Sequence, residues 1–301
     1  MWAAHRVAAV DWSGAKKGAA RHLWIAEWDP VATRVCSVVP ASREEAVAYL
    51  CELAGRDDQA LVGLDFNFSF PEWWLDTCAI EHPRELWADA PRLEAWLEAC
   101  APPFWGRPGR PRPQLTERQQ FRATELAVAG GEAGAGEAGA GVRRRPKSVF
   151  QIGGAGAVGT GSLRGMPALA QLARAGFAIW PFDNCSHQTG ASQNCASQAG
   201  GCQAGGYRPA VVEVWPRLAA PSVIKSRAPE RRTWLDERAR LLGPGVAELA
   251  GASDDAFDAV AAVIALAAVG RAVLADVEDH VARREGWIAG VALPMTPIAT
   301  V

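Results

Sequence analysis

The order of strand-like and helix-like segments in the first 66 residues most constrains what this chain can fold into. Strands are expected at Arg6–Trp12, Leu23–Trp28, Val31–Val39 and Leu61–Phe66, and a helix at Ser42–Ala54. The short links between the first three segments are typical of hairpins, so these strands should be antiparallel neighbours. The helix is long enough to cross the sheet, which would place the fourth strand parallel to the first. This order predicts an α/β fold with a mixed sheet of about five strands, three antiparallel strands followed by parallel ones, flanked by helices.

The rest of the chain is interpreted as part of the same single domain, residues 1–301, with long insertions. Residues 101–147 are rich first in Pro and Arg and then in Gly and Ala, and residues 184–207 form a loop of Gly, Ser, Gln and Cys. The tract Gly130–Gly141 has too few bulky apolar side chains to offset the entropy of ordering, so we predict a mobile linker there.

Regular elements are expected between and after these insertions. Strands are predicted at Ser148–Ile152, Phe177–Phe182 and Pro209–Trp215, and helices at Arg84–Ala99, Pro167–Ala175, Glu230–Leu242 and Asp255–Ala275.

Composition and charge exclude few functions. The chain is 49% hydrophobic and 21% charged, which is ordinary for a soluble globular protein. Its net charge of −2 gives no general attraction to nucleic acid, so a phosphate-rich partner would need a local basic patch. The N-terminus has no charged-then-apolar leader, and the longest apolar run, Ala259–Gly270, is shorter than the ~20 residues that span a bilayer. We therefore expect a cytoplasmic protein with no membrane partner, and the oligomeric state is left open.

The alanine-rich helix near the C-terminus opens with aspartates, which are costly in an apolar setting unless a partner meets them. Ser253 can cap this helix, and Asp255 in its first turn complements the positive end of the helix dipole. Asp258 lies beyond the first turn and shares a face with Ala261 and Ala262. Small residues let a helix approach a sheet closely, so we predict a metal-binding or catalytic role for Asp258, whereas capping remains an alternative for Asp255.

Two further aspartates, Asp11 and Asp65, each end a short apolar run that is predicted to be a strand. Each has a simple alternative: Asp11 can form a turn with its own backbone, and Asp65 can cap the loop toward Pro71. If their strands are adjacent and parallel, however, both aspartates lie at the edge of the sheet where α/β proteins usually bind ligands. Together with Asp258 they predict a site for a divalent metal ion.

Several of these motifs resemble known proteins. The strand order, the strand-end aspartates and the helix motif Asp255-Ala-Phe-Asp258 resemble the ribonuclease H-like superfamily, and the helix motif is similar to that of Holliday-junction resolvases. More closely, four short segments at the two ends of the chain resemble a prokaryotic family of uncharacterised predicted RNase H-like nucleases: Val10–Gly14, Gly63–Phe66, Val212–Pro216 and Asp255–Ala259. The resemblance implies a ribonuclease H-like fold. It also makes Glu213 a further acidic site residue, with an edge-strand glutamate that faces solvent as the alternative.

This set of acids fits metal-dependent cleavage of a phosphodiester bond. Two divalent ions ~4 Å apart can activate a water and stabilise the leaving oxygen, and carboxylates balance their charge. Mg²⁺ or Mn²⁺ is the expected cofactor, because these ions prefer oxygen ligands. In this hypothesis Asp11 bridges the two ions, and Asp65 and Asp258 each hold one. Asp255 or Glu213 completes a shell or orients the water. The predicted function is therefore that of a metal-dependent nuclease, with nucleic acid as its partner.

Two groups of basic residues are candidates to hold substrate phosphates. They are Lys16 and Lys17 in the first hairpin, and the cluster of Arg143, Arg144, Arg145 and Lys147. A run of charge is more often a solvated face, which is the alternative for both groups.

Residues Gly154–Gly159 form a literal GxGxxG, the fingerprint of dinucleotide binding. We do not expect nicotinamide or flavin binding, because Thr160–Gly165 should delay the following helix, the next acid is the distant Asp183, and no N-terminal βαβ unit surrounds the motif. The glycines could instead bring backbone N–H groups close to a ligand, so this loop could line the acidic cleft.

Four residues of the loop at 184–207, namely Cys185, His187, Cys195 and Cys202, could together supply a Cys₃His zinc set. Their spacing contains no Cys-x₂-Cys pair, and the chain has an odd number of cysteines, 7 in all. The spacing argues against a zinc site, and the odd number favours reduced thiols over a disulfide framework.

Two other functions are alternatives to a nuclease. A non-catalytic protein of the same fold could use the acidic cleft to bind a ligand or nucleic acid, and the weak basicity of the chain favours this. An ATP-binding enzyme like actin or the sugar kinases would also begin with a strand, an aspartate and a glycine-containing hairpin. It would need a second such hairpin, and the sequence has no convincing repeat of the one at Asp11.

Overall fold

The computed structural model describes residues 3–16, 18–130, 146–154, 156–185 and 207–293, and its centre is a six-stranded mixed sheet. The strands are β1 (Val7–Asp11), β2 (Trp24–Asp29), β3 (Arg34–Pro40), β4 (Leu61–Leu64), β5 (Ala178–Ile179) and β6 (Ala210–Glu213), in the order β3-β2-β1-β4-β6-β5. β1, β2 and β3 are antiparallel neighbours, whereas β4, β6 and β5 continue the sheet in parallel with β1. The predicted mixed α/β sheet is therefore confirmed, with one strand more than expected.

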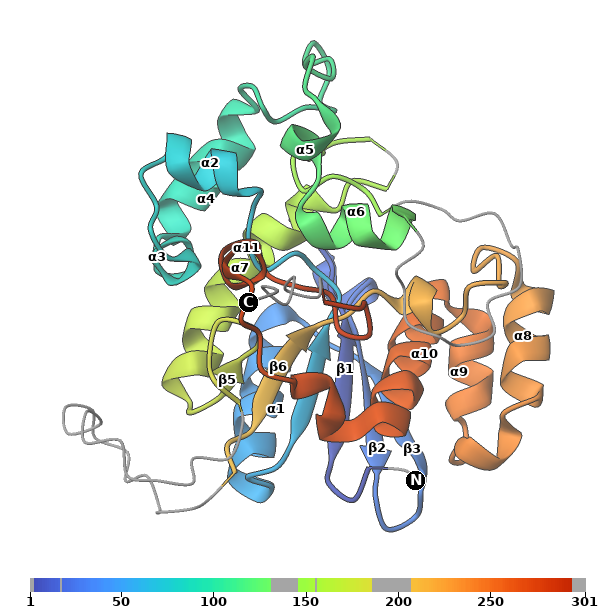
Figure 1. The fold of residues 1–301 in the computed structure, drawn as a ribbon. Helices are drawn as coiled ribbons and strands as arrows, with labels where there is room; N and C mark the ends of the chain where they lie inside the picture. The colour runs from blue at the N-terminus through green and yellow to red at the C-terminus, as the bar shows by residue number, and fades with distance from the viewer. Residues whose placement is uncertain (1–2, 17, 131–145, 155, 186–206, 294–301) are drawn as a thin grey trace.

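Helices cover both faces of the sheet and one of its ends (Figure 1). The α-helices are α1 (Arg43–Arg56), α2 (Glu72–Thr77), α3 (Pro83–Ala88), α4 (Ala90–Ala99), α5 (Glu117–Gln120), α6 (Ala123–Gly130), α7 (Gly159–Arg174), α8 (Ala228–Asp236), α9 (Val246–Ala252), α10 (Asp254–Val269) and α11 (His280–Glu285). Short 3₁₀ helices are η1 (Ala19–Arg21), η2 (Pro216–Leu218), η3 (Ala239–Leu241) and η4 (Gly270–Leu274). Helices α2 to α6 lie beyond the C-terminal ends of β1 and β4, at the top of Figure 1.

Alternating side chains of the strands build two separate cores. Ala8 and Val10 of β1 belong to the core that includes residues of α1 and α7. Val7 and Ala9 belong to the core formed with α10, which lies across β1 and β2. Because side chains alternate along a strand, the next residue of β1 after Val10 points back to the α10 face. The sheet therefore decides which side chains at its edge can meet α10.

The predicted crossover helix forms as α1. Its N-cap is Ser42, whose side chain accepts a hydrogen bond from the backbone N–H of Glu45 (3.1 Å). The Glu45 carboxylate accepts in return from the N–H of Ser42 (2.7 Å), which completes a capping box. Leu50 and Leu53 are buried against the sheet, so a local start signal and an apolar face together fix this helix.

Two predicted strands do not form as expected. At Ser148–Ile152 the chain turns, and the bridge found there is an isolated one between Gln151 and Trp105. Its apolar residues are buried in the core with α7, which explains the misleading pattern. The strand predicted at Phe177–Phe182 shrinks to β5, because Asp183 closes a turn: its carboxylate accepts from the N–H of Ile179 (2.8 Å), and its own N–H donates to the Ile179 carbonyl (2.9 Å).

Several helix boundaries differ from the prediction. The segment Arg84–Ala99 contains two helices, because Asp89 caps α4 by accepting from the N–H of Arg92 (3.0 Å). Within Glu230–Leu242, α8 ends at Asp236 and is followed by η3. The long C-terminal helix ends at Val269, where Gly270 adopts a φ of 58° and η4 begins.

The predicted insertion at 101–147 contains α5 and α6, and it contributes Arg122 and Glu125 to the buried interior. It is therefore integrated into the fold as far as residue 130. Residues 131–145, which include the predicted linker from residue 131 onward, and residues 186–206 of the Cys-containing loop lie outside the described residues.

Helix α10 together with η4 is long and apolar enough to cross a membrane when judged by length and composition. Its apolar window is 67% buried within the protein. Packing on β1 and β2 accounts for this apolar character without a membrane.

Candidate metal centre

Strands β1 and β4 place Asp11 and Asp65 side by side. The strands are parallel and pair Val10 with Leu64, so the residues that follow them are neighbours at the same sheet edge. The backbone N–H of Asp65 donates to the carbonyl of Val10 (3.0 Å), which extends the ladder to this point. Alternation along the two strands turns both carboxylates toward α10. The predicted juxtaposition of the two strand-end aspartates is thus realised.

Helix α10 supplies the third carboxylate. Its N-cap is Ser253, whose hydroxyl accepts from the N–H of Ala256 (3.2 Å), so the helix begins at Asp254 as a sequence of this type predicts. Asp258 follows one turn later and is 8% exposed, among alanines that are almost fully buried. These small side chains let α10 lie close to β1 and β2. The close packing brings the carboxylate of Asp258 near the sheet.

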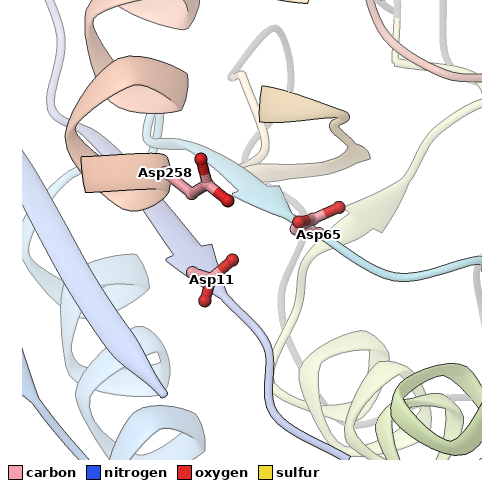
Figure 2. Close-up of side chains that lie close together, drawn as sticks. All are labelled: Asp11, Asp65 and Asp258. Carbon is pink, nitrogen blue, oxygen red and sulfur yellow. The ribbon is translucent and has the colours of Figure 1, made fainter. Parts of the chain in front are cut away.

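The carboxylates of Asp11, Asp65 and Asp258 point toward one another, as Figure 2 shows. Each offers one oxygen, and these oxygens all lie within 4.8 Å of one another. Two oxygens that share an ion at about 2.1 Å are at most about 4.2 Å apart, so a small side-chain movement allows all three to share one ion. We refer to these three residues as the aspartate triad.

Burial and mutual repulsion disfavour the charged forms of the triad. Burial, followed by the charge of Asp258, raises the pKa of Asp65 to about 7. Burial and the charges of Asp258 and Asp65 raise the pKa of Asp11 well above its usual range. The pKa of Asp258 is also raised by burial, although Lys225 opposes this effect. Three carboxylates at this separation, two buried and one half-buried, therefore need positive charge to stay ionised.

Lys225 supplies part of that charge, although the sequence motifs did not predict it as a site residue. It lies in the loop between η2 and α8, and its Nζ donates to Oδ2 of Asp258. Although burial lowers it, the pKa of Lys225 is raised overall by Asp258 and Asp11. No local pattern marks this lysine as a site residue, because its loop reaches the triad only through tertiary packing.

The triad borders a cavity of about 320 Å³. Asp11, Asp65 and Lys225 line this cavity, whereas Asp258, which accepts a hydrogen bond from Lys225, is not part of its wall. Gly156, Ala157 and Val158 of the GxGxxG segment also line the cavity, as the sequence suggested.

Asp255 lies outside the triad but still faces the cavity. Its Oδ2 is 3.1 Å from Nδ1 of His22, in the hairpin between β1 and β2. The pair connects the first turn of α10 with that hairpin. Asp255 therefore lies in the first turn of the helix, as predicted, and its side chain also pairs with His22 at the rim of the site.

Glu213 reaches the cavity from the other face of the sheet. The register pairs Glu213 with Leu64, so its side chain points away from α10, whereas Asp65 points toward it. Its oxygens accept hydrogen bonds from Arg122 (2.5 and 2.8 Å) and from the N–H of Phe68 (3.1 Å). Glu213 is 3% exposed, which excludes the alternative of a solvent-facing edge residue. Sequence alternation along β6 could have revealed this orientation.

The expected phosphate-binding residues are divided. Lys147 lines the cavity and is exposed. Lys16 is instead 3.8 Å from Glu94, outside the cavity wall. Lys17, Arg143, Arg144 and Arg145 lie outside the described residues.

The two remaining motifs have different outcomes. Contrary to the expected delay, α7 begins at Gly159, and Thr160–Gly165 is helical. A Cβ on Gly159 would lie 2.0 Å from the Val149 carbonyl oxygen, so close backbone packing explains the glycine. In the proposed zinc set Cys185 is a free thiol, and His187, Cys195 and Cys202 lie outside the described residues.

The triad offers carboxylate oxygens alone, a donor set that fits hard divalent ions such as Mg²⁺ and Mn²⁺. Comparisons of the chain with protein-family models, curated proteins and solved structures found no match. The chemistry of this centre is therefore inferred from its own geometry.

Proposed function

We propose that this protein is a metal-dependent nuclease of ribonuclease H-like fold that hydrolyses phosphodiester bonds in nucleic acid. The observation that carries the proposal is the convergence of three carboxylates within 4.8 Å, two from adjacent parallel strand ends and one from a helix; Asp11 and Asp258 are buried and Asp65 is half-buried. Buried like charges at this distance are costly, so a fold that keeps them together benefits from a bound cation.

The topology supports the fold assignment within this proposal. Three antiparallel strands are followed by a crossover helix and a strand that pairs in parallel with the first. The acids lie at the C-terminal ends of β1 and β4 and on the helix that covers one face of the sheet. This is the arrangement that the sequence motifs of Asp11, Asp65 and Asp258 imply.

In the proposed site, Asp11, Asp65 and Asp258 hold Mg²⁺ or Mn²⁺. When bound, such a divalent ion activates water and stabilises the leaving oxygen of a phosphodiester. Lys225 and Lys147 are positive groups of the cavity wall and are placed to attract a phosphate. Asp255 and His22 form a polar pair at the rim and orient one another.

A non-catalytic binding protein is the second candidate, and Lys225 favours it. Because its ammonium group meets Asp258 directly, the protein already contains one cation for the triad. An acidic cleft with its own counter-ion could serve to bind a ligand without hydrolysis.

A nuclease assay separates these candidates. The full chain is incubated with single-stranded, duplex, hybrid and branched substrates in Mg²⁺, Mn²⁺ or EDTA, next to Asp11→Asn and Asp258→Asn. We expect cleavage that depends on metal and falls by at least about 100-fold in both variants, since each loses a ligand that contributes several kcal/mol. Asp29→Asn is the matched control: Asp29 ends β2 at the opposite end of the sheet, and its Oδ1 accepts from the N–H of Val31 (2.8 Å).

Equal cleavage by the wild type and both site variants would show contamination, and the nuclease proposal would fail. Metal-dependent binding of nucleic acid without cleavage would support the second candidate. Assay of ATP hydrolysis under the same conditions tests the kinase-like alternative.

A further inference from the structure

We infer that the triad takes one divalent ion, and that the ammonium group of Lys225 occupies the place of a second. This inference rests on the proposed metal site. It differs from the two-ion site expected from the sequence, and it assigns to Lys225 a role in setting how many ions bind.

Most acids around the cavity already have partners. Glu213 and Glu125 both accept hydrogen bonds from the fully buried guanidinium group of Arg122. Asp255 is paired with His22. Asp11 and Asp65 are therefore the acids of the cavity wall that remain for a metal, with Asp258 next to them, and a second ion would need further ligands from carboxylates that are already engaged.

Lys225 restricts the triad itself. Its Nζ is bonded to Oδ2 of Asp258, and its side chain, not that of Asp258, lines the cavity. An ion that enters from the cavity meets Asp11 and Asp65 directly but meets Asp258 only next to the ammonium group. Asp258 thus accepts the hydrogen bond from Lys225 with one carboxylate oxygen, and its other oxygen remains available to an ion.

The charges agree with a single ion. Three ionised aspartates carry −3 and Lys225 carries +1, so one divalent ion brings the sum of these groups to zero. A second divalent ion would leave +2 in a site whose carboxylates are mostly buried, and Lys225 would repel it. In this arrangement the ammonium group provides a fixed positive charge of the kind that a second ion would supply.

Manganese binding to the full chain tests the inference without reference to catalysis. Isothermal titration calorimetry gives the number of bound Mn²⁺ ions, and electron paramagnetic resonance of Mn²⁺ shows whether two ions are coupled. We expect one ion in the wild type. Lys225→Met removes the charge but keeps most of the side chain, and we expect it to bind a second Mn²⁺ at least about tenfold more tightly than the wild type does.

Two variants are matched controls. Lys225→Arg keeps the positive charge and should still bind one ion. Lys147→Met removes the same charge from another part of the cavity wall and should also bind one. Thermal unfolding of each variant checks that the fold is retained.

Two coupled ions in the wild type would overturn the inference, and so would unchanged binding of one ion in a folded Lys225→Met variant. No Mn²⁺ binding at all in the wild type would overturn both this inference and the metal site on which it rests. One bound ion together with no cleavage of any nucleic acid would support the inference and contradict the nuclease proposal.

Discussion

Carboxylates of one chemical type have different roles here because they meet different partners. Glu213 is paired with a buried arginine, Asp255 with a histidine at the rim, and Asp258 with Lys225. Asp11 and Asp65 line the cavity next to these pairs. Their pKa values are raised, and they have too little positive charge nearby. A buried carboxylate needs a cation, so these two residues mark where an added ion stabilises the protein most.

Asp65→Asn should stabilise the protein in the absence of metal and abolish its stabilisation by metal. Ionised Asp65 is disfavoured by burial and by Asp258, so the neutral amide relieves this cost by about 1–3 kcal/mol at pH 8. Thermal unfolding with and without Mn²⁺ measures both effects. A variant that loses stability without metal, or that keeps the full metal-induced rise in Tm, would contradict the assignment of Asp65 as a ligand.

Metal affinity should fall as the pH is lowered through the pKa of Asp65. Because this pKa is raised to about 7, the carboxyl group binds a proton below that pH and must release it before it can hold an ion. The apparent Mn²⁺ affinity should therefore decrease as the pH falls below 7, by about tenfold per pH unit for each carboxyl group that must release a proton. Calorimetry in buffers of different ionisation enthalpy should detect proton release at pH 6. Affinity that is independent of pH between 5.5 and 8 would contradict the prediction.

The same pKa shift fixes the sign of the effect on stability. In the unfolded chain Asp65 titrates near about 4, so between about pH 4 and 7 the folded protein binds more protons than the unfolded one. The contribution of Asp65 to the free energy of unfolding is therefore fully present below about pH 4 and is lost as the pH rises through 7.

At the scale of elements, close backbone packing holds the loop after β1 against α7. A Cβ on Gly14 would lie 2.5 Å from the backbone nitrogen of Gly161, so the two segments touch through their main chains. Arginine side chains hold the same loop: Arg43 Nε donates to the carbonyl of Ser13 (3.1 Å), and Arg164 donates to that of Gly14. Because the loop follows Asp11 directly, this packing also fixes the end of β1 at the site.

Gly14→Ala should destabilise the protein by about 1–3 kcal/mol, because a methyl group cannot fit without moving one backbone away from the other. It should also weaken Mn²⁺ binding, since Asp11 lies at the base of the displaced loop. The matched control is Gly55→Ala in α1, where nothing lies within 4 Å of the added Cβ. That change should leave stability unchanged or raise it by up to about 1 kcal/mol. Urea unfolding measures both, and equal stability of the two variants would contradict the packing argument.

At the scale of the whole molecule, one buried ion network joins the helices above the sheet to the sheet itself. Arg122, which is fully buried just before α6, donates to Glu125 (2.8 Å), to Glu213 of β6 (2.8 Å) and to the carbonyl of Glu285 in α11 (3.0 Å). The Glu285 carboxylate accepts in turn from the N–H of Glu72 at the start of α2 (2.7 Å). The network thus connects α2, α6, β6 and α11, which are far apart in the sequence.

Arg122→Met should destabilise the protein by about 3–5 kcal/mol, because it leaves two buried glutamates without their cation. Arg92→Met removes an exposed arginine from a pair with Asp89 (2.9 Å) and should change stability by less than about 1 kcal/mol. Adding Glu213→Gln to Arg122→Met should recover part of the loss, which a double-mutant cycle in urea can measure. A small effect of Arg122→Met would show that the glutamates do not depend on it.

The sequence by itself determined the features that depend on local patterns. The short links between the strand-like segments predicted the antiparallel strands, the crossover helix predicted the parallel β4, and capping residues predicted where α1 and α10 begin. Asp11 and Asp65 were identified because a strand end is a local feature, and parallel pairing then makes the two residues neighbours. Local patterns gave wrong predictions for a strand at Ser148–Ile152 and for the start of α7. At these places burial in the core and packing of glycine against distant backbone override the local preference for a strand or a loop.

Only the tertiary structure decided which charged groups meet. Lys225 reaches Asp258 across 33 residues, His22 reaches Asp255 across 233, and Arg122 reaches Glu213 across 91. A side chain's direction along a strand or helix follows from backbone geometry within a few residues. Its partner depends instead on how separate elements pack, and the sequence around Lys225 contains no signal of that packing.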